Sequence, residues 1–187
     1  MDDNLAARLR LVLVTDDALL LGRDLLEVCR RAVRGGVTCV QLRLKTAAPR
    51  ELVAKARALV AALPVPVIIN DRLDVALAAG AAGVHLGGDD LPVSLARGIV
   101  PAAFWIGASV GGAGEVAAGQ AADYWGVGPW RATSTKPDAG AALGPEGFRS
   151  ICLLGQGIPC VAIGGIRPED VRAVRGAGGA GVAVVSG

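Results

Sequence analysis

The sequence contains one histidine and no two cysteines in a CxxC arrangement. With His85 alone, a nucleophilic site that uses a second histidine is excluded, and we expect this residue to be packed and hydrogen-bonded inside a strand. The absence of a CxxC pair argues against a zinc site. The cysteines lie among apolar residues, which predicts reduced thiols in the core of a cytoplasmic protein: Cys29, Cys39, Cys152 and Cys160.

Long apolar segments and concentrations of one charge are also missing. No apolar run approaches the roughly 20 residues that span a bilayer, and the N-terminus carries acidic side chains where a signal peptide carries basic ones. The formal net charge is only +2 and no block of like charges occurs, so nucleic acid and anionic membranes are not expected partners. A small anionic substrate needs only a local basic cluster.

The composition is typical of a compact α/β protein. Hydrophobic residues make up 52% and charged residues 19% of the 187 residues, and 27 glycines suit many tight turns. A chain of this length can bury one core but not two ordinary ones, so we expect a single domain that covers residues 1–187.

Eight short apolar runs alternate with helical segments along the chain. Apolar spacing predicts a helix over Asp24–Val33, and Pro49 opens another that ends near Pro64. The spacings are regular and no reversal of strand order is signalled, which favours a closed (β/α)8 TIM barrel over an open doubly wound sheet. The predicted strands are residues 11–15, 37–42, 65–70, 83–86, 104–109, 123–127, 158–163 and 181–185.

The last predicted strand is followed by no eighth helix, although such barrels usually need at least about 200 residues. We expect either that the sequence is truncated or that another subunit covers one side of this strand, so a homo-oligomer is left open. The longest connection, residues 128–147, has no apolar period and is expected to be an active-site loop. Trp130 in this loop is a candidate for ligand contact, whereas Trp105 and Trp125 are expected in the core.

Asp71 and Asp90 follow two neighbouring apolar strands. If these strands are parallel, their carboxyl ends share one edge of the sheet, and the two carboxylates can converge there. Two carboxylates with open coordination positions suit Mg²⁺ held jointly with substrate phosphates. Each aspartate could equally cap the helix that follows it.

Two cations and an amide stand at the end of the second strand. Gln41, Arg43 and Lys45 alternate with Leu42 and Leu44, so they point to one side of an extended chain. This arrangement suits an anion cradle. Surface ion pairs are the alternative explanation for the two cations.

Further polar or flexible residues stand where other predicted strands end, which is where the catalytic residues of a barrel lie. Gly164 and Gly165 follow the seventh strand, where exposed amides often bind phosphate, although glycines also serve ordinary turns. The remaining candidates are Asn70, Asp89, Ser109, the loop residues Thr133, Ser134, Thr135 and Lys136, and Val185 and Ser186.

In their joint order, these motifs resemble the thiamine phosphate synthase family, also called thiamine-phosphate pyrophosphorylase. The resemblance implies a transferase that joins hydroxymethylpyrimidine diphosphate to a thiazole phosphate and releases pyrophosphate. It covers nearly the whole chain: VTD at 14–16, QLRLK at 41–45, INDRLDVALAAGAAGVHLG at 69–87, DD at 89–90, IGAS at 106–109, GVGP at 126–129, TSTK at 133–136, AIGGI at 162–166 and AVVS at 183–186.

The resemblance also implies a role for each matching position. Asp71 and Asp90 hold Mg²⁺. The pyrimidine diphosphate site comprises Gln41, Arg43, Lys45, Asn70, Ser109 and Lys136, and the thiazole phosphate site comprises Thr133, Ser134, Thr135, Gly165, Val185 and Ser186. The implied mechanism is dissociative: Mg²⁺ and the cations stabilise departing pyrophosphate, and the aminopyrimidine stabilises a methylene cation that the thiazole nitrogen captures.

Two departures from the family pattern bear on function. Gly111 stands where the family often has a histidine, which the related thiazole tautomerase uses, and Gly88 stands in place of a usual glutamine. The missing histidine argues against a tautomerase-like paralogue. The intact diphosphate and metal groups argue against a non-catalytic protein that binds thiazole phosphate or thiamine phosphate. Both remain alternatives to the synthase.

Overall fold

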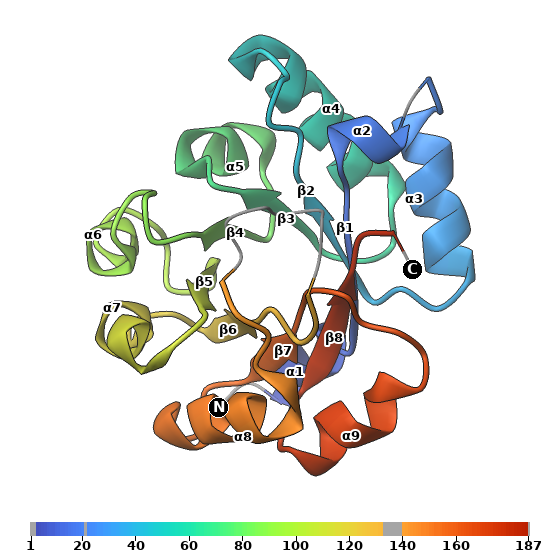
Figure 1. Ribbon diagram of the computed structural model, residues 1–187. Helices are drawn as coiled ribbons and strands as arrows, with labels where there is room; N and C mark the ends of the chain where they lie inside the picture. The colour runs from blue at the N-terminus through green and yellow to red at the C-terminus, as the bar shows by residue number, and fades with distance from the viewer. Residues whose placement is uncertain (1–2, 21, 133–139, 187) are drawn as a thin grey trace.

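Eight parallel strands close into a barrel, and helices surround it (Figure 1). The structure is a computed structural model that describes residues 3–20, 22–132 and 140–186. The strands follow one another around the barrel in sequence order, and the last pairs with the first. The predicted (β/α)8 TIM barrel is therefore confirmed.

Each strand coincides with one of the predicted apolar runs, and each end lies within two residues of its predicted position. Their bounds are β1 Leu11–Val14, β2 Cys39–Leu42, β3 Val67–Asn70, β4 Gly83–Leu86, β5 Trp105–Val110, β6 Tyr124–Val127, β7 Cys160–Ala162 and β8 Gly181–Val184. Short runs of β-branched and small apolar residues suit strands that are covered on both faces.

The helices are α1 Asp3–Arg8, α2 Asp17–Leu20, α3 Leu25–Arg34, α4 Pro49–Ala62, α5 Leu73–Ala79, α6 Val93–Arg97, α7 Val116–Gly119, α8 Gly144–Leu154 and α9 Asp170–Gly176, with a 3-10 turn η1 at Ala113–Glu115. Asp24 caps α3 by accepting a hydrogen bond from Glu27 N at 2.7 Å. Gly80, with φ +67°, ends α5 in the left-handed conformation. In the part of the chain that the structure describes, no helix is long and apolar enough to cross a membrane.

Apolar side chains form one cluster inside the barrel and another between the strands and the helices. Residues that alternate along a strand point to opposite faces, so most strands contribute to both clusters. The inner cluster includes Val12, Cys39, Ile68, Tyr124 and Val161, joined by Leu5 and Leu9 from α1 and its end. The outer cluster is larger and includes Val40, Ile69, Ile106, Trp125 and Phe148. The carboxyl ends of the strands are left for polar groups.

All four cysteines are free thiols, and three of them are buried. Burial raises the pKa of the Cys39 thiol to about 12 and that of the Cys29 thiol to about 11. Such thiols are poor nucleophiles because little thiolate forms near neutral pH. The prediction of core thiols holds for these two and for Cys160, whereas Cys152 on α8 is only half-buried.

Candidate active site at the carboxyl ends of the strands

Arg43 is held at the end of β2 by the loop that follows β1. Its Nη1 lies 2.6 Å from Asp16 Oδ2, and the two side chains are only 20% and 13% exposed. The Thr15 hydroxyl accepts the backbone N–H of Arg43 at 2.9 Å and donates to the Arg43 carbonyl at 3.1 Å. Asp16 Oδ1 in turn accepts the backbone N–H of Ala18 at 3.0 Å. Arg43 is therefore a positioned charge rather than a freely moving surface side chain.

Lys45 connects the same loop to the end of β3. Its backbone N–H donates to Asp17 Oδ2 at 2.6 Å, and the hydroxyl of Thr46 donates to Asp17 Oδ1 at 2.9 Å. The ammonium of Lys45 lies 3.1 Å from Asp71 Oδ2. The acidic loop after β1 thus orders the basic loop after β2, and Lys45 stands beside one of the two predicted metal ligands.

Asp71 and Asp90 lie together at the ends of β3 and β4. Asp71 has a left-handed backbone, φ +64°, which aspartate tolerates better than most residues, and its N–H donates to the His85 carbonyl at 2.8 Å. Asp90 Oδ2 accepts the N–H of Gly87 at 2.7 Å. Burial raises the pKa of the Asp90 carboxyl; the Gly87 N–H opposes this, and a hydrogen bond with Asp71 raises the pKa further. The two acids therefore share one site.

The alternative hypothesis for these two aspartates is that each caps the helix that follows it. The N-cap positions of α5 and α6 are occupied by Arg72 and Pro92, and neither makes a side-chain cap hydrogen bond. Neither Asp71 nor Asp90 is thus used as a helix cap. Their carboxylates are turned toward each other and toward Lys45 instead.

A chain of polar side chains crosses the barrel interior below this rim. His85 Nδ1 lies 3.0 Å from Tyr124 Oη, and His85 Nε2 lies 3.1 Å from Ser109 Oγ. The side chain of Gln41 on β2 lies near the Tyr124 hydroxyl. His85 is 9% exposed, so the expectation of a packed, hydrogen-bonded histidine is confirmed. The sequence analysis did not identify Tyr124. Tyr124 and Gly126 are two residues apart on β6, so they face the same side of the strand, and this spacing could have placed the phenol inside the barrel.

On the opposite side of the barrel, glycines allow the loops after β6 and β7 to approach each other. Gly164 and Gly165 have φ of +92° and +64°. A Cβ on Gly164 would lie 2.8 Å from Pro129 Cβ, and one on Gly165 would lie 2.9 Å from Arg131 Cβ. Close packing of the chain therefore explains both glycines by itself. A phosphate-binding role stays a prediction for Gly165, Val185 and Ser186.

Trp130 belongs to the core, so the expectation that it contacts a ligand is wrong. It is 3% exposed, and its ring packs edge-on against Phe148 with a centroid distance of 5.6 Å. Arg131 beside it forms an ion pair with Asp170, which is 4% exposed and also accepts the N–H of Arg167 at 2.9 Å. The base of the predicted active-site loop is thus folded onto α8 and α9. Sequence reasoning did not identify Asp170.

The remaining predicted residues are placed only in part. Asn70 is half-buried as the last residue of β3, directly before Asp71. Asp89 is exposed beside Asp90. The loop residues Thr133, Ser134, Thr135 and Lys136 lie outside the described residues, so their roles remain predictions from the sequence.

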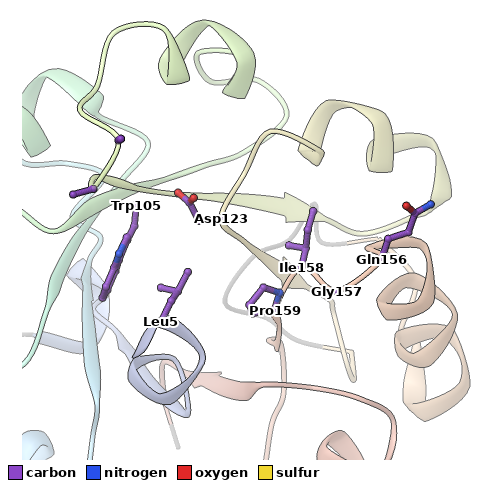
Figure 2. A pocket seen from close by; sticks show the side chains of 9 residues that line it. Leu5, Trp105, Asp123, Gln156, Gly157, Ile158 and Pro159 are labelled. Atoms are coloured by element: carbon purple, nitrogen blue, oxygen red, sulfur yellow. The ribbon is translucent and has the colours of Figure 1, made fainter. Parts of the chain in front are cut away.

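A pocket with a volume of about 400 Å³ lies at the other, amino-terminal end of the barrel (Figure 2). Figure 2 shows Leu5 and Trp105 near one another on one side and Ile158 and Pro159 on the other. The one acidic residue of its lining, Asp123, already accepts the N–H of Ile106 at 2.7 Å and pairs with an arginine of α6. Trp105 was expected in the core and is only half-buried here. The groups suited to chemistry stand at the opposite end, as in other barrels.

A closed parallel barrel with cations and carboxylates gathered at the carboxyl ends of its strands has the architecture of a TIM-barrel enzyme, whose chemistry takes place at that end. The comparisons make this specific: the chain belongs to the thiamine monophosphate synthase family, whose model matches residues 11–187. The family suspected from the motifs is confirmed, and with it a transferase.

Individual relatives agree with this assignment. The thiamine-phosphate synthase of Azorhizobium caulinodans is 51% identical over 95% of this chain and 86% of that protein. That of Albidiferax ferrireducens is 49% identical over 95% of this chain and 83% of that protein. The structure of thiamine phosphate pyrophosphorylase from Pyrococcus furiosus matches with a TM-score of 0.84 at 37% identity, over 98% of this chain and 88% of that one.

Proposed function

We propose that this protein is a thiamine phosphate synthase, which joins hydroxymethylpyrimidine diphosphate to a thiazole phosphate and releases pyrophosphate. The observation that carries the proposal is the contact of Lys45, Asp71 and Asp90 at one rim, beside the fixed guanidinium of Arg43. About half of the residues are identical to those of synthases over nearly the whole chain.

The cations act on the leaving group. Negative charge builds on the diphosphate as its bond to the pyrimidine methylene breaks, and fixed positive groups stabilise that charge without reorganising. Arg43 and Lys45 are held in place by Asp16, Asp17 and Asp71. Lys136 supplies a further positive charge in this proposal. Its assignment rests only on the match of the TSTK motif to the family.

The other candidates bind the two organic substrates. The aminopyrimidine lies against Gln41, Asn70 and Ser109, where the ring's electron density stabilises the methylene cation that the thiazole nitrogen captures. Neither a general base nor a protein nucleophile takes part, which agrees with a buried, hydrogen-bonded His85. The thiazole phosphate is assigned to Thr133, Ser134, Thr135, Gly165, Val185 and Ser186.

Asp71 and Asp90 fit Mg²⁺. They offer hard carboxylate oxygens. Burial raises the pKa of Asp90, and its contact with Asp71 raises the pKa further. A divalent cation between the two carboxylates would offset their mutual repulsion. Among the described residues, no group of three or more His, Cys, Asp or Glu side chains could hold a metal. A cation held by this pair therefore takes further ligands from substrate phosphates and water, as Mg²⁺ commonly does. When bound, Mg²⁺ neutralises charge on the departing diphosphate.

The geometry at Gly111 favours the synthase over a thiazole tautomerase. Gly111 directly follows β5 at the rim, and its N–H donates to Glu115. A Cβ at this position would lie 3.1 Å from the Gly128 carbonyl oxygen, tighter than an ordinary contact. The histidine that the tautomerase uses could be placed here only if the loop after β6 shifted.

We further propose that the reaction takes place in the cytoplasm. The four cysteines are free, and three are packed in the core, as in proteins of reducing compartments. Both proposed substrates are small molecules, and neither calls for a nucleic acid or a membrane partner.

The test is pyrophosphate release by the purified protein from the two substrates, with and without Mg²⁺. We expect release only when both substrates and the metal are present. Asp71→Ala should lower the rate about a hundredfold or more, because one metal ligand and the partner of Lys45 are lost together.

The matched control is Asp74→Ala, which removes an exposed carboxylate on α5 whose ion-pair partner is Arg72. This variant should release pyrophosphate at the wild-type rate. Circular dichroism should show the same fold for both variants. Metal-independent release, or wild-type release by Asp71→Ala, contradicts the proposal.

A further inference from the structure

The bend that carries Lys45 has no backbone ladder to hold it. β2 ends at Leu42 and α4 begins at Pro49, and residues 45–47 between them form the bend. As far as the structure describes the chain, the backbone of residues 45–47 makes no hydrogen bond to another backbone group. The position of the bend therefore depends on side chains from other elements.

Packing holds the two ends of the bend but not its middle. Leu44 and Ala47 pack against the outer apolar cluster, whereas Lys45 and Thr46 are exposed. A pocket with a volume of about 360 Å³ lies against the bend on the side of α2, α3 and α4, and Thr46 and Ala47 line it. Apolar contacts alone therefore leave the backbone of Lys45 free to move.

Asp17 supplies the contacts that the middle of the bend lacks. Its Oδ2 accepts the backbone N–H of Lys45 at 2.6 Å, and its Oδ1 accepts the hydroxyl of Thr46 at 2.9 Å. Asp17 is the first residue of α2, but its own helix does not use the carboxylate. The N–H of Ala18 is accepted by Asp16 Oδ1 at 3.0 Å instead.

Asp17 contacts the backbone of Lys45 and not its ammonium. The ammonium lies 3.1 Å from Asp71 Oδ2 at the end of β3, and the Lys45 side chain is 55% exposed. A lysine side chain that is half in solvent has many rotamers, so its charge is placed only when the backbone from which the stem extends is fixed. Asp17 thus limits where the charge of Lys45 can reach.

We propose that Asp17 is a positioning residue for the reaction, because it holds the bend so that the ammonium of Lys45 lies at the end of β3. The consequence for catalysis rests on the proposed function, since a cation already in place stabilises the charge that develops on the departing diphosphate. The ordering of the bend does not rest on it.

The geometry of the two hydrogen bonds is what matters, and the negative charge of Asp17 is not required. An asparagine can make both bonds, because its amide oxygen can accept the Lys45 N–H and its amide nitrogen can donate to Thr46 Oγ1. Asp17→Asn should therefore keep the bend ordered, whereas Asp17→Ala should release it. The two variants separate a positioning role from an effect of charge.

The first measurement needs no substrate. The chain has three lysines, Lys45, Lys55 and Lys136, so a protein labelled with ¹⁵N-lysine gives three backbone amide signals, and Lys45→Met identifies the one of interest. Hydrogen exchange of the Lys45 amide should become about tenfold faster in Asp17→Ala and stay close to the wild-type rate in Asp17→Asn. The Lys55 amide inside α4 serves as the internal reference. An unchanged exchange rate of the Lys45 amide in Asp17→Ala overturns the inference.

The second measurement is a double-mutant cycle on pyrophosphate release. Asp17→Ala should lower kcat/KM for the pyrimidine diphosphate about tenfold and leave the KM for the thiazole phosphate unchanged. Asp17→Asn should recover the rate to within about threefold of the wild type. When Lys45→Met is already present, Asp17→Ala should cause no further loss, because the group that it positions is gone.

A merely structural role of Asp17 predicts equal losses with and without Lys45→Met. Asp24→Ala is the matched control, because the Asp24 carboxylate also accepts a backbone N–H at 2.7 Å, that of Glu27 at the start of α3. This control should lower the melting temperature and keep the kinetic constants. Equal losses in the two backgrounds, or wild-type kinetics of Asp17→Ala, overturn the inference. If the wild-type protein releases no pyrophosphate, the proposed function fails, and exchange of the Lys45 amide still decides whether Asp17 holds the bend.

Discussion

At the scale of single residues, the carboxylate of Asp16 is the least expected part of the proposed diphosphate site. It adds a negative charge close to where a diphosphate is proposed to bind, which by itself weakens binding. Its contact of 2.6 Å with Arg43, however, fixes a long side chain that would otherwise lose conformational entropy when the substrate arrives. We expect the second effect to dominate, because both side chains are mostly buried and already ordered.

The prediction for Asp16→Asn is a rise of at least about tenfold in the KM for the pyrimidine diphosphate, since a hydrogen bond between charged groups is lost. Asp16→Glu, which keeps the charge, should recover part of this loss. Steady-state kinetics of pyrophosphate release provide the measurement. Glu27→Gln is the control, because it breaks an exposed arginine–carboxylate pair on α3 and should leave the kinetics unchanged. An unchanged KM for the pyrimidine diphosphate in Asp16→Asn would show that Arg43 binds the substrate equally well without its ion pair to Asp16.

At the scale of elements, Asp170 joins the loop after β6 to the start of α9. Its buried carboxylate accepts hydrogen bonds from the Arg131 side chain and from Arg167 N. The hydrogen bond from Arg131 lowers the pKa of Asp170, burial opposes this, and the hydrogen bond from Arg167 N lowers the pKa further. These contacts hold the base of the loop that carries the TSTK motif against the barrel.

The sign of the pH dependence follows from that lowered pKa. A carboxyl with a folded-state pKa below its ordinary value of 3.8 stabilises the fold fully above about pH 4 and loses this contribution as the pH falls through the folded-state value. Asp170→Asn should therefore lower the free energy of unfolding by about 2 kcal/mol at neutral pH. Urea denaturation at several pH values should show this difference shrinking below pH 4. A difference that is independent of pH would mean that the charge of Asp170 does not contribute.

The elements could be predicted because their signals are local. Val67, Ile68 and Ile69 are β-branched and buried, and the aspartates after β3 and β4 had to meet once neighbouring strands were parallel. The contacts that escaped prediction join residues far apart in the sequence, such as Arg131 and Asp170 or His85 and Tyr124. These depend on the register of the strands around the closed barrel, which composition does not reveal.

The error over Trp130 has the same origin. The composition of residues 128–147, rich in glycine and alanine with no apolar period, indicated a loop, and a tryptophan in a loop near the rim suggested ligand contact. Whether that ring faces the rim or the core depends on Phe148, which α8 brings to within 5.6 Å of it. A large aromatic side chain is buried wherever the fold provides a matching apolar surface.

At the scale of the whole molecule, stability and chemistry are located at opposite ends of the barrel. The amino-terminal end is closed by Leu5 and Leu9, which pack into the inner apolar cluster. The carboxyl ends carry the charged rim around Arg43, Lys45 and Asp71. Because the strands between them are short and rigidly hydrogen-bonded, damage at one end should reach the other only by unfolding the barrel.

Leu9→Ala tests this separation. Leu9 is fully buried, so the substitution leaves a cavity and should lower the free energy of unfolding by about 3 kcal/mol. Under conditions where the variant remains folded, kcat and both KM values should match those of the wild type, because no rim residue has moved. Urea denaturation and pyrophosphate release measured on the same preparation give the two quantities. Leu153→Ala, which truncates a side chain that is 70% exposed, should change neither by a measurable amount. A loss of turnover in folded Leu9→Ala would instead mean that packing at the amino-terminal end sets the geometry of the rim through the barrel interior.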